Sequence, residues 1–82
     1  MQQTEIYEKL TEVMRDVFDD EALVATPGMT ANDVKEWDSV NHVSFIIAIE
    51  EEFGIKFKTS EVEKMKNVGQ MVEQIEAKTA AK

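Results

Sequence analysis

Apolar residues recur with the period of an α-helix along most of this 82-residue chain. Steps of three and four residues place the first set on one face of a helix that ends near Phe18. That set is Ile6, Leu10, Val13, Met14, Val17 and Phe18. A second set near the end of the chain, Val68, Met71, Val72 and Ile75, has the same spacing. The chain also has only three glycines and one proline, too few for a turn-rich all-β fold. We therefore expect an all-α protein.

Local start and stop signals set the expected helix boundaries. Thr4 is the predicted N-cap of the first helix, and Asp38 or Ser39 that of the second. The second helix should stop at Gly54. We expect its inward face to consist of Val40, Val43, Ile46, Ile47 and Phe53.

The remaining signals complete the expected layout. Thr26-Pro27-Gly28 breaks a long loop over about residues 19–38. Ser60 with Glu63 forms a predicted capping box for a short helix at about residues 60–65, and Asn67 with Gln70 marks the last helix. We expect a small four-helix bundle of three longer helices and one short helix, with the long loop between the first and second. It should form a single domain over residues 1–82 with an ordered core of about residues 4–78.

The charge is strongly acidic and unevenly distributed. Seventeen Asp and Glu residues outnumber nine Lys and Arg, and residues 1–54 contain 13 of these acids with only three bases. Nucleic acid and anionic membranes would repel such a chain, whereas a partner with a basic face would attract it. The start of the chain lacks a basic leader, and the longest apolar run, Phe45–Ile49, has five residues, too few to span a membrane. We expect a cytoplasmic monomer that does not insert into membranes.

Few residues could support catalysis or metal binding. The chain has no cysteine, which excludes a disulfide, a thiolate zinc site and a cysteine nucleophile. Asp38, Ser39 and His42 form the one Asp/Ser/His set, but a hydrolase would also need an oxyanion hole and a better-placed carboxylate. The acidic clusters at 19–21 and 50–52 do not match a calcium loop. We therefore expect no metal site, and His42 is interpreted as a solvated helix residue.

Ser39 has two interpretations. A serine at a helix start is often a capping residue. Its hydroxyl also follows a long loop, so it should be exposed where a helix N-terminus favours an attached phosphate.

Residues 36–55 resemble the core of the acyl carrier protein family. Asp38-Ser39-Val40 stands where the family has Asp-Ser-Leu, and Glu50-Glu51-Glu52-Phe53 follows at the family spacing. The helices and the long loop also come in the family's order. The resemblance implies a carrier with no catalysis of its own, which serves fatty-acid, polyketide or related biosynthesis.

The resemblance also implies roles for individual residues. Ser39 would be esterified with 4′-phosphopantetheine from coenzyme A by a phosphopantetheinyl transferase, with Asp38 contributing to recognition. Acyl thioesters on the arm would then pass to acyl-transferring, condensing or adenylating enzymes with basic faces. The implied acyl pocket consists of Ile46, Ile49, Phe57, Val62 and Met65. The implied partner-binding residues are Val40, Asn41, Ser44, Glu50 and Glu51.

Departures from the family pattern suggest a specialised carrier. Asn41 and Ser44 stand where fatty-acid members usually have acids, and Trp37 stands where the family often has a small residue. A polyketide, modified-lipid or amino-acid pathway fits these differences. The alternatives are a peptidyl or aminoacyl carrier, an unmodified interaction module that works by docking, and a small hydrolase built on Ser39 and His42.

Overall fold

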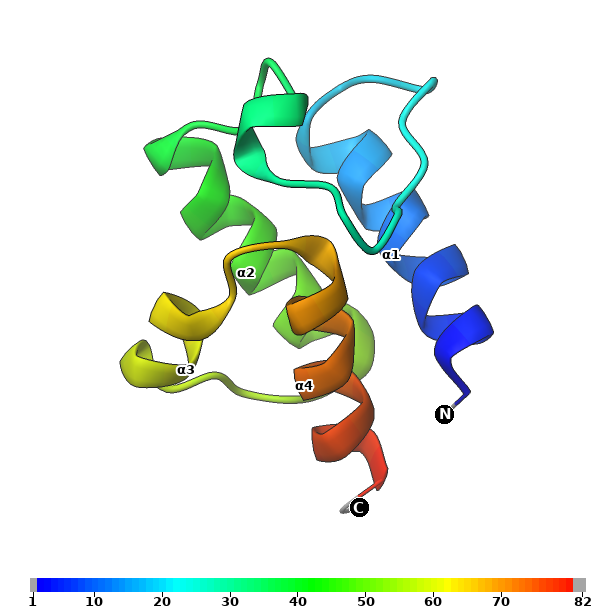
Figure 1. Ribbon diagram of the computed structural model, residues 1–82, viewed down its shortest axis with the longest axis vertical. Helices are drawn as coiled ribbons and strands as arrows, with labels where there is room; N and C mark the ends of the chain where they lie inside the picture. The colour runs from blue at the N-terminus through cyan, green and yellow to red at the C-terminus, as the bar shows by residue number, and fades with distance from the viewer. Residues whose placement is uncertain (1, 81–82) are drawn as a thin grey trace.

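The computed structural model describes residues 2–80, and every regular element in that range is helical. The helices are α1 (Gln3–Val17), α2 (Ser39–Phe53), α3 (Thr59–Lys64) and α4 (Val68–Ala80), with a 3-10 turn, η1 (Ala31–Asp33), in the long loop. In Figure 1 the three longer helices form a bundle, the short α3 lies beside α2, and the loop covers the end opposite the two termini. The expected all-α four-helix fold is confirmed.

Helix α1 has the predicted apolar face but an earlier start. Ile6, Leu10, Val13 and Met14 are buried, and the N–H of Ile6 already donates to the Gln2 carbonyl at 3.1 Å. Thr4 therefore lies inside the first turn, and its predicted role as N-cap is wrong. The helix ends near Phe18 as expected, because Asp19 adopts a left-handed conformation with φ of 50°, which Asp tolerates better than most residues.

Helix α2 has the predicted ends, but the face that it buries differs from the predicted one. The Asp38 side chain accepts from the Asn41 N–H at 2.8 Å, and Gly54 ends the helix with φ of 65°. Two members of the expected inward face, Ile46 and Phe53, are buried together with Phe45 and Ile49. The other three are exposed, by 75% for Val40, 58% for Val43 and 50% for Ile47.

The reason is that α2 is apolar on two sides. Burial of the larger side chains removes more apolar surface from water than burial of valines does. The side with Phe45 and Phe53 therefore packs into the bundle. Val40, Val43 and Ile47, which we call the α2 stripe, face outward.

Of the two predicted side-chain contacts at the later helix starts, the Asn67 cap is confirmed and the Ser60–Glu63 capping box is wrong. Helix α3 begins at Thr59, because the Glu61 carboxylate accepts from the Lys58 N–H at 2.8 Å; no bond of the expected Ser60–Glu63 box is found. The Asn67 side chain caps α4 as expected, accepting from the Gln70 N–H at 2.8 Å. Helix α4 continues to Ala80, and residues 81–82 lie outside the described range.

Backbone contacts hold the long loop (residues 19–38) against the bundle. The Ala25 N–H donates to the Thr11 hydroxyl on α1 at 2.9 Å. At the start of α4, the Gly69 N–H donates to the Pro27 carbonyl at 2.9 Å. A Cβ on Gly69 would lie 2.9 Å from that carbonyl oxygen, closer than van der Waals contact allows, so this approach requires glycine. These contacts tie the loop to α1 and to the start of α4.

Candidate functional site

Ser39 is an exposed residue at the first position of α2. Asp38, not Ser39, caps the helix, which settles the choice that the sequence left open. Within residues 2–80 the Ser39 hydroxyl has no hydrogen-bond partner. A group attached to this oxygen would lie at the positive end of a 15-residue helix, where an anion is stabilised.

A shallow hollow of about 470 Å³ lies beside Ser39, lined by Ala31, Trp37, Asp38, Ser39 and His42. Inside it the Trp37 Nε1–H donates to His42 Nδ1 at 2.9 Å. The two ring planes are also nearly parallel, 17° apart, with the ring centroids 6.0 Å apart. His42 is therefore half-buried and hydrogen-bonded, so its interpretation as a solvated helix residue is wrong.

The same contacts argue against the hydrolase alternative. A serine hydrolase needs a carboxylate bonded to one imidazole nitrogen and the serine hydroxyl bonded to the other. Here Trp37 occupies Nδ1 of His42, and Asp38 accepts from the Asn41 backbone. Ser39 and His42 share the hollow without forming a catalytic pair.

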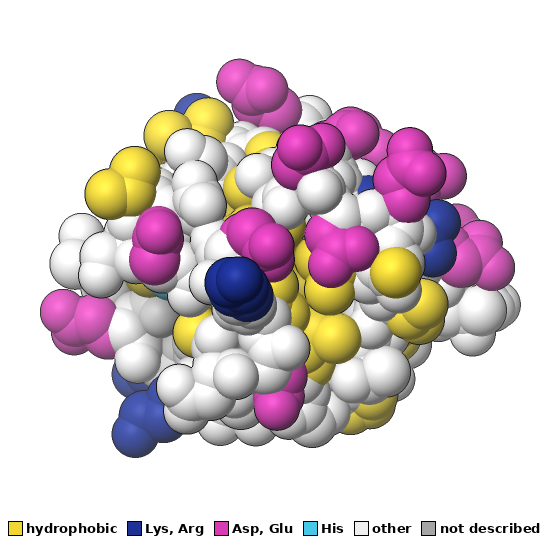
Figure 2. Space-filling view, turned by 90° about the horizontal axis from the view of Figure 1, so that it is seen from above, with side chains coloured by type: hydrophobic (Ala, Val, Ile, Leu, Met, Phe, Trp, Pro, Cys, Tyr) yellow, Lys and Arg dark blue, Asp and Glu magenta, His cyan; other side chains and the backbone are white. Residues whose placement is uncertain are grey.

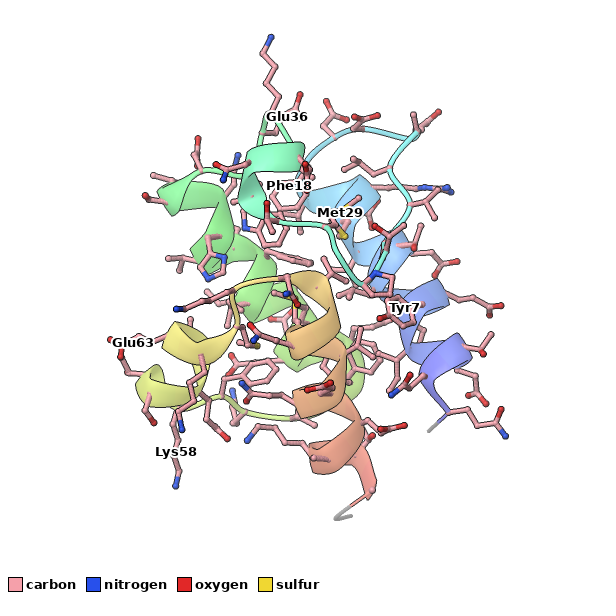
Figure 3. All side chains as sticks on the ribbon, viewed as in Figure 1. Tyr7, Phe18, Met29, Glu36, Lys58 and Glu63 are labelled. Carbon is pink, nitrogen blue, oxygen red and sulfur yellow. The ribbon has the colours of Figure 1, made fainter. Side chains whose placement is uncertain are left out.

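The Trp37–His42 pair is anchored in the core. Trp37 is only 7% exposed, and its ring lies 5.6 Å from that of Phe18 and 5.3 Å from that of Phe45. Figure 3 labels Phe18 near η1, where the loop meets the bundle. The aromatic cluster thus fixes the turn from loop into α2, and with it the position of Ser39.

Burial lowers the pKa of His42 below its usual value. The unfolded chain therefore binds a proton more readily than the folded one as the pH falls through about 6.5, and the folded state loses stability. We expect the wild type to lose more unfolding free energy than His42→Gln between about pH 7.5 and pH 5.5. Urea unfolding at the two pH values measures this, and the carboxylates common to both proteins cancel. Equal losses in the two proteins would contradict the prediction.

A second, apolar hollow lies between α2 and α3. It has a volume of about 210 Å³ and is lined by His42, Val43, Ile46, Ile47, Thr59 and Val62. Of the five residues predicted for an acyl pocket, Ile46 and Val62 are in this lining. Ile49 and Met65 are buried in the core, and Phe57 is half-buried with Lys78 Nζ 5.6 Å from its ring centre. The structure brings two of the five to one opening.

The predicted partner-binding residues fall into two groups. Val40, Ser44 and Glu51 are exposed on α2. The side chains of Asn41 and Glu50 instead form hydrogen bonds with the backbone. Asn41 Nδ2 donates to the Glu36 carbonyl at 2.7 Å, and Glu50 Oε2 accepts from the Phe57 N–H at 2.8 Å.

Sequence reasoning missed two exposed residues beside this group. Val43 and Ile47 stand on the α2 stripe with Val40. The available signal was the number of apolar residues in α2, which is more than one helix face can hold.

The end of the bundle that carries the loop is acidic. Figure 2 shows Asp and Glu side chains spread over this face, with apolar side chains exposed between them. Within residues 2–80, no group of three or more His, Cys, Asp or Glu side chains is arranged to hold a metal ion. Over the same part of the chain, no helix has the length and apolar character needed to cross a membrane.

Known proteins resemble this chain over nearly its whole length, although no protein-family model matches it. The acyl carrier protein of Thermosynechococcus vestitus is 33% identical over 81 residues, which cover 99% of this chain and 100% of that protein. The acyl carrier protein of Lactobacillus acidophilus is 31% identical over 77 residues, covering 94% and 96%. Among solved structures, the solution NMR structure of a holo acyl carrier protein from Geobacter metallireducens superimposes with a TM-score of 0.87. That protein is 39% identical, and the match covers 92% of this chain and 86% of that one.

Proposed function

Because this chain belongs to the acyl carrier protein family, we propose that it carries acyl groups on a 4′-phosphopantetheine arm attached to Ser39. One observation supports this assignment most directly. The Ser39 hydroxyl is exposed and has no hydrogen-bond partner within residues 2–80, and it stands at the start of α2 directly after the capping residue.

The residues around Ser39 fit such a group. The first N–H groups of α2 favour a phosphate on this oxygen, and Asp38 keeps the helix start ordered through its 2.8 Å bond to the Asn41 N–H. When bound, the arm supplies a terminal thiol that holds the acyl group as a thioester. The chain itself has no cysteine, so no protein thiol competes for that acyl group.

The apolar hollow between α2 and α3 supports a proposal for the kind of acyl group carried. Its lining by Val43, Ile46, Ile47 and Val62 suits an acyl chain rather than a charged one. Its volume of about 210 Å³ is small, and two other residues of the predicted pocket, Ile49 and Met65, are buried in the core. A short acyl chain fits this space, and a longer one requires core side chains to move.

The pathway is proposed to be a specialised one. Asn41 and Ser44 bring no charge to α2 where fatty-acid members of the family usually have acids. Enzymes of polyketide, modified-lipid or amino-acid pathways are the proposed partners, and their basic faces would meet the acidic end of this protein.

Measurement of the intact mass tests whether the arm attaches to this chain. The purified chain is incubated with coenzyme A and a phosphopantetheinyl transferase, and one phosphopantetheine is expected to be added. No addition with several transferases would favour an unmodified interaction module. Cleavage of an activated ester by the unmodified chain would instead favour the hydrolase.

The α2 stripe is the proposed contact surface for the transferase and for later enzymes. Val43→Asp places a charge in the middle of this surface, and it is expected to raise the transferase KM by about 5- to 30-fold, the effect of losing 1–2 kcal/mol of contact energy. Val24→Asp is a matched control, because Val24 is 53% exposed and Val43 is 58% exposed, and Val24 lies in the loop. Equal effects of the two substitutions would show that added charge, not the stripe, is responsible.

A further inference from the structure

His42 stands between the two hollows of the site. It lines the larger hollow with Ser39 and also lines the apolar hollow with Val43, Ile46 and Val62. Ser39 and His42 are three residues apart on α2, so they occupy neighbouring positions on one helix face. An arm that leaves Ser39 and turns toward the apolar hollow must therefore pass the imidazole.

Trp37 determines which ring nitrogen of His42 can donate a further hydrogen bond. Its Nε1–H donates to His42 Nδ1 at 2.9 Å, so Nδ1 of the neutral ring is an acceptor and the proton is on Nε2. The hydrogen bond and the core position of Trp37 keep this orientation fixed. His42 consequently has one remaining donor, the Nε2–H, and within residues 2–80 no protein group accepts from it.

We propose that His42, held by Trp37, is a positioning residue for the prosthetic arm, and that its Nε2–H donates a hydrogen bond to the phosphate attached at Ser39. The inference rests on the proposed function, since it requires the phosphate. A phosphodiester is an anion, and a charge-assisted bond to it is stronger than a bond to a neutral acceptor. His42 would thereby direct the start of the arm toward the apolar hollow instead of leaving it free in solvent.

The charges near His42 make this contact measurable. Among the residues that line either hollow, Asp38 is the other titratable group; Trp37 and Ala31 from the loop and Thr59 and Val62 from α3 carry no charge. Asp38 is present with and without the arm. A change in the His42 pKa on loading would therefore report the added phosphate.

The experiment compares apo and holo protein by NMR. The His42 pKa is expected to be higher in the holo protein, because the phosphate favours the imidazolium, and the ³¹P signal should titrate with the same midpoint. His42→Gln should remove that ³¹P titration. Trp37→Phe keeps an aromatic ring but removes the N–H that donates to His42 Nδ1. The imidazole ¹⁵N shifts should then show a mixture of tautomers, and the increase in the His42 pKa on loading should be smaller.

A second imidazole on α2 provides the control. Ser44→His in the His42→Gln background places one on an exposed part of the same helix, where its pKa should change much less on loading than that of His42. If intact mass shows that the arm is attached and the imidazole pKa changes equally at the two positions, this inference is overturned and the proposed function remains intact. Failure of the arm to attach would overturn the proposed function and this inference together.

Discussion

Ser39→Ala is expected to abolish attachment of phosphopantetheine completely while the helical fold persists. The substitution removes the oxygen that would be esterified. Loss of an N-cap side chain costs about 0.5–2 kcal/mol, but that cost does not arise here, because Asp38 makes the capping bond. Alanine is also a favourable residue within a helix. Intact mass after incubation with coenzyme A and transferase measures attachment, and thermal unfolding followed by circular dichroism measures the fold.

Ser44→Ala is the matched control for this experiment. Ser44 is an exposed serine on the same helix, so its removal should leave the attached mass unchanged. If Ser39→Ala still gained the mass of one phosphopantetheine, another residue would be the attachment site and the assignment would be wrong. If both variants lost it, damage to the transferase contact would be the better explanation.

The parts of this fold that were predicted correctly depend on local chemistry. Asp38 and Gly54 fix the ends of α2, and Asn67 caps α4, through contacts with residues close by in the chain. Such contacts can be inferred from the order of residues alone. Ser39 was proposed as the attachment site on different grounds, because Asp38-Ser39-Val40 and the later Glu50-Glu51-Glu52-Phe53 resemble the family pattern.

The parts that were not predicted depend on packing between distant residues. The helical period of α2 fits two apolar faces, and only the bundle decides that Phe45 is buried and Val43 is not. The Trp37–His42 bond likewise requires the turn between loop and helix that Phe18 and Phe45 hold in place. A tryptophan before the capping residue and a histidine four residues after it were visible in the sequence. Their contact became evident only when the turn was known.

Phe18→Ala is expected to be the most destabilising single change at the site, with a loss of about 3–5 kcal/mol of unfolding free energy. Phe18 is 1% exposed, and its ring lies 5.6 Å from that of Trp37 and 5.2 Å from that of Phe45. Its removal leaves a cavity where α1, the loop and α2 meet. Because domains have a total stability of about 5–15 kcal/mol, this loss is a large part of the total. Urea unfolding measures the loss.

The control is Val24→Ala, since Val24 in the long loop is 53% exposed and its truncation should change the unfolding free energy by less than about 0.5 kcal/mol. Trp37 is the single tryptophan of the chain, so its fluorescence reports the turn that positions Ser39. In the folded fraction of Phe18→Ala, the Trp37 emission should shift toward that of solvent-exposed tryptophan, because one wall of its site is missing. A Phe18→Ala protein with wild-type stability and unchanged Trp37 emission would show that the aromatic cluster does not hold the turn. The position of Ser39 would then depend on the Asp38 cap and the loop hydrogen bonds alone.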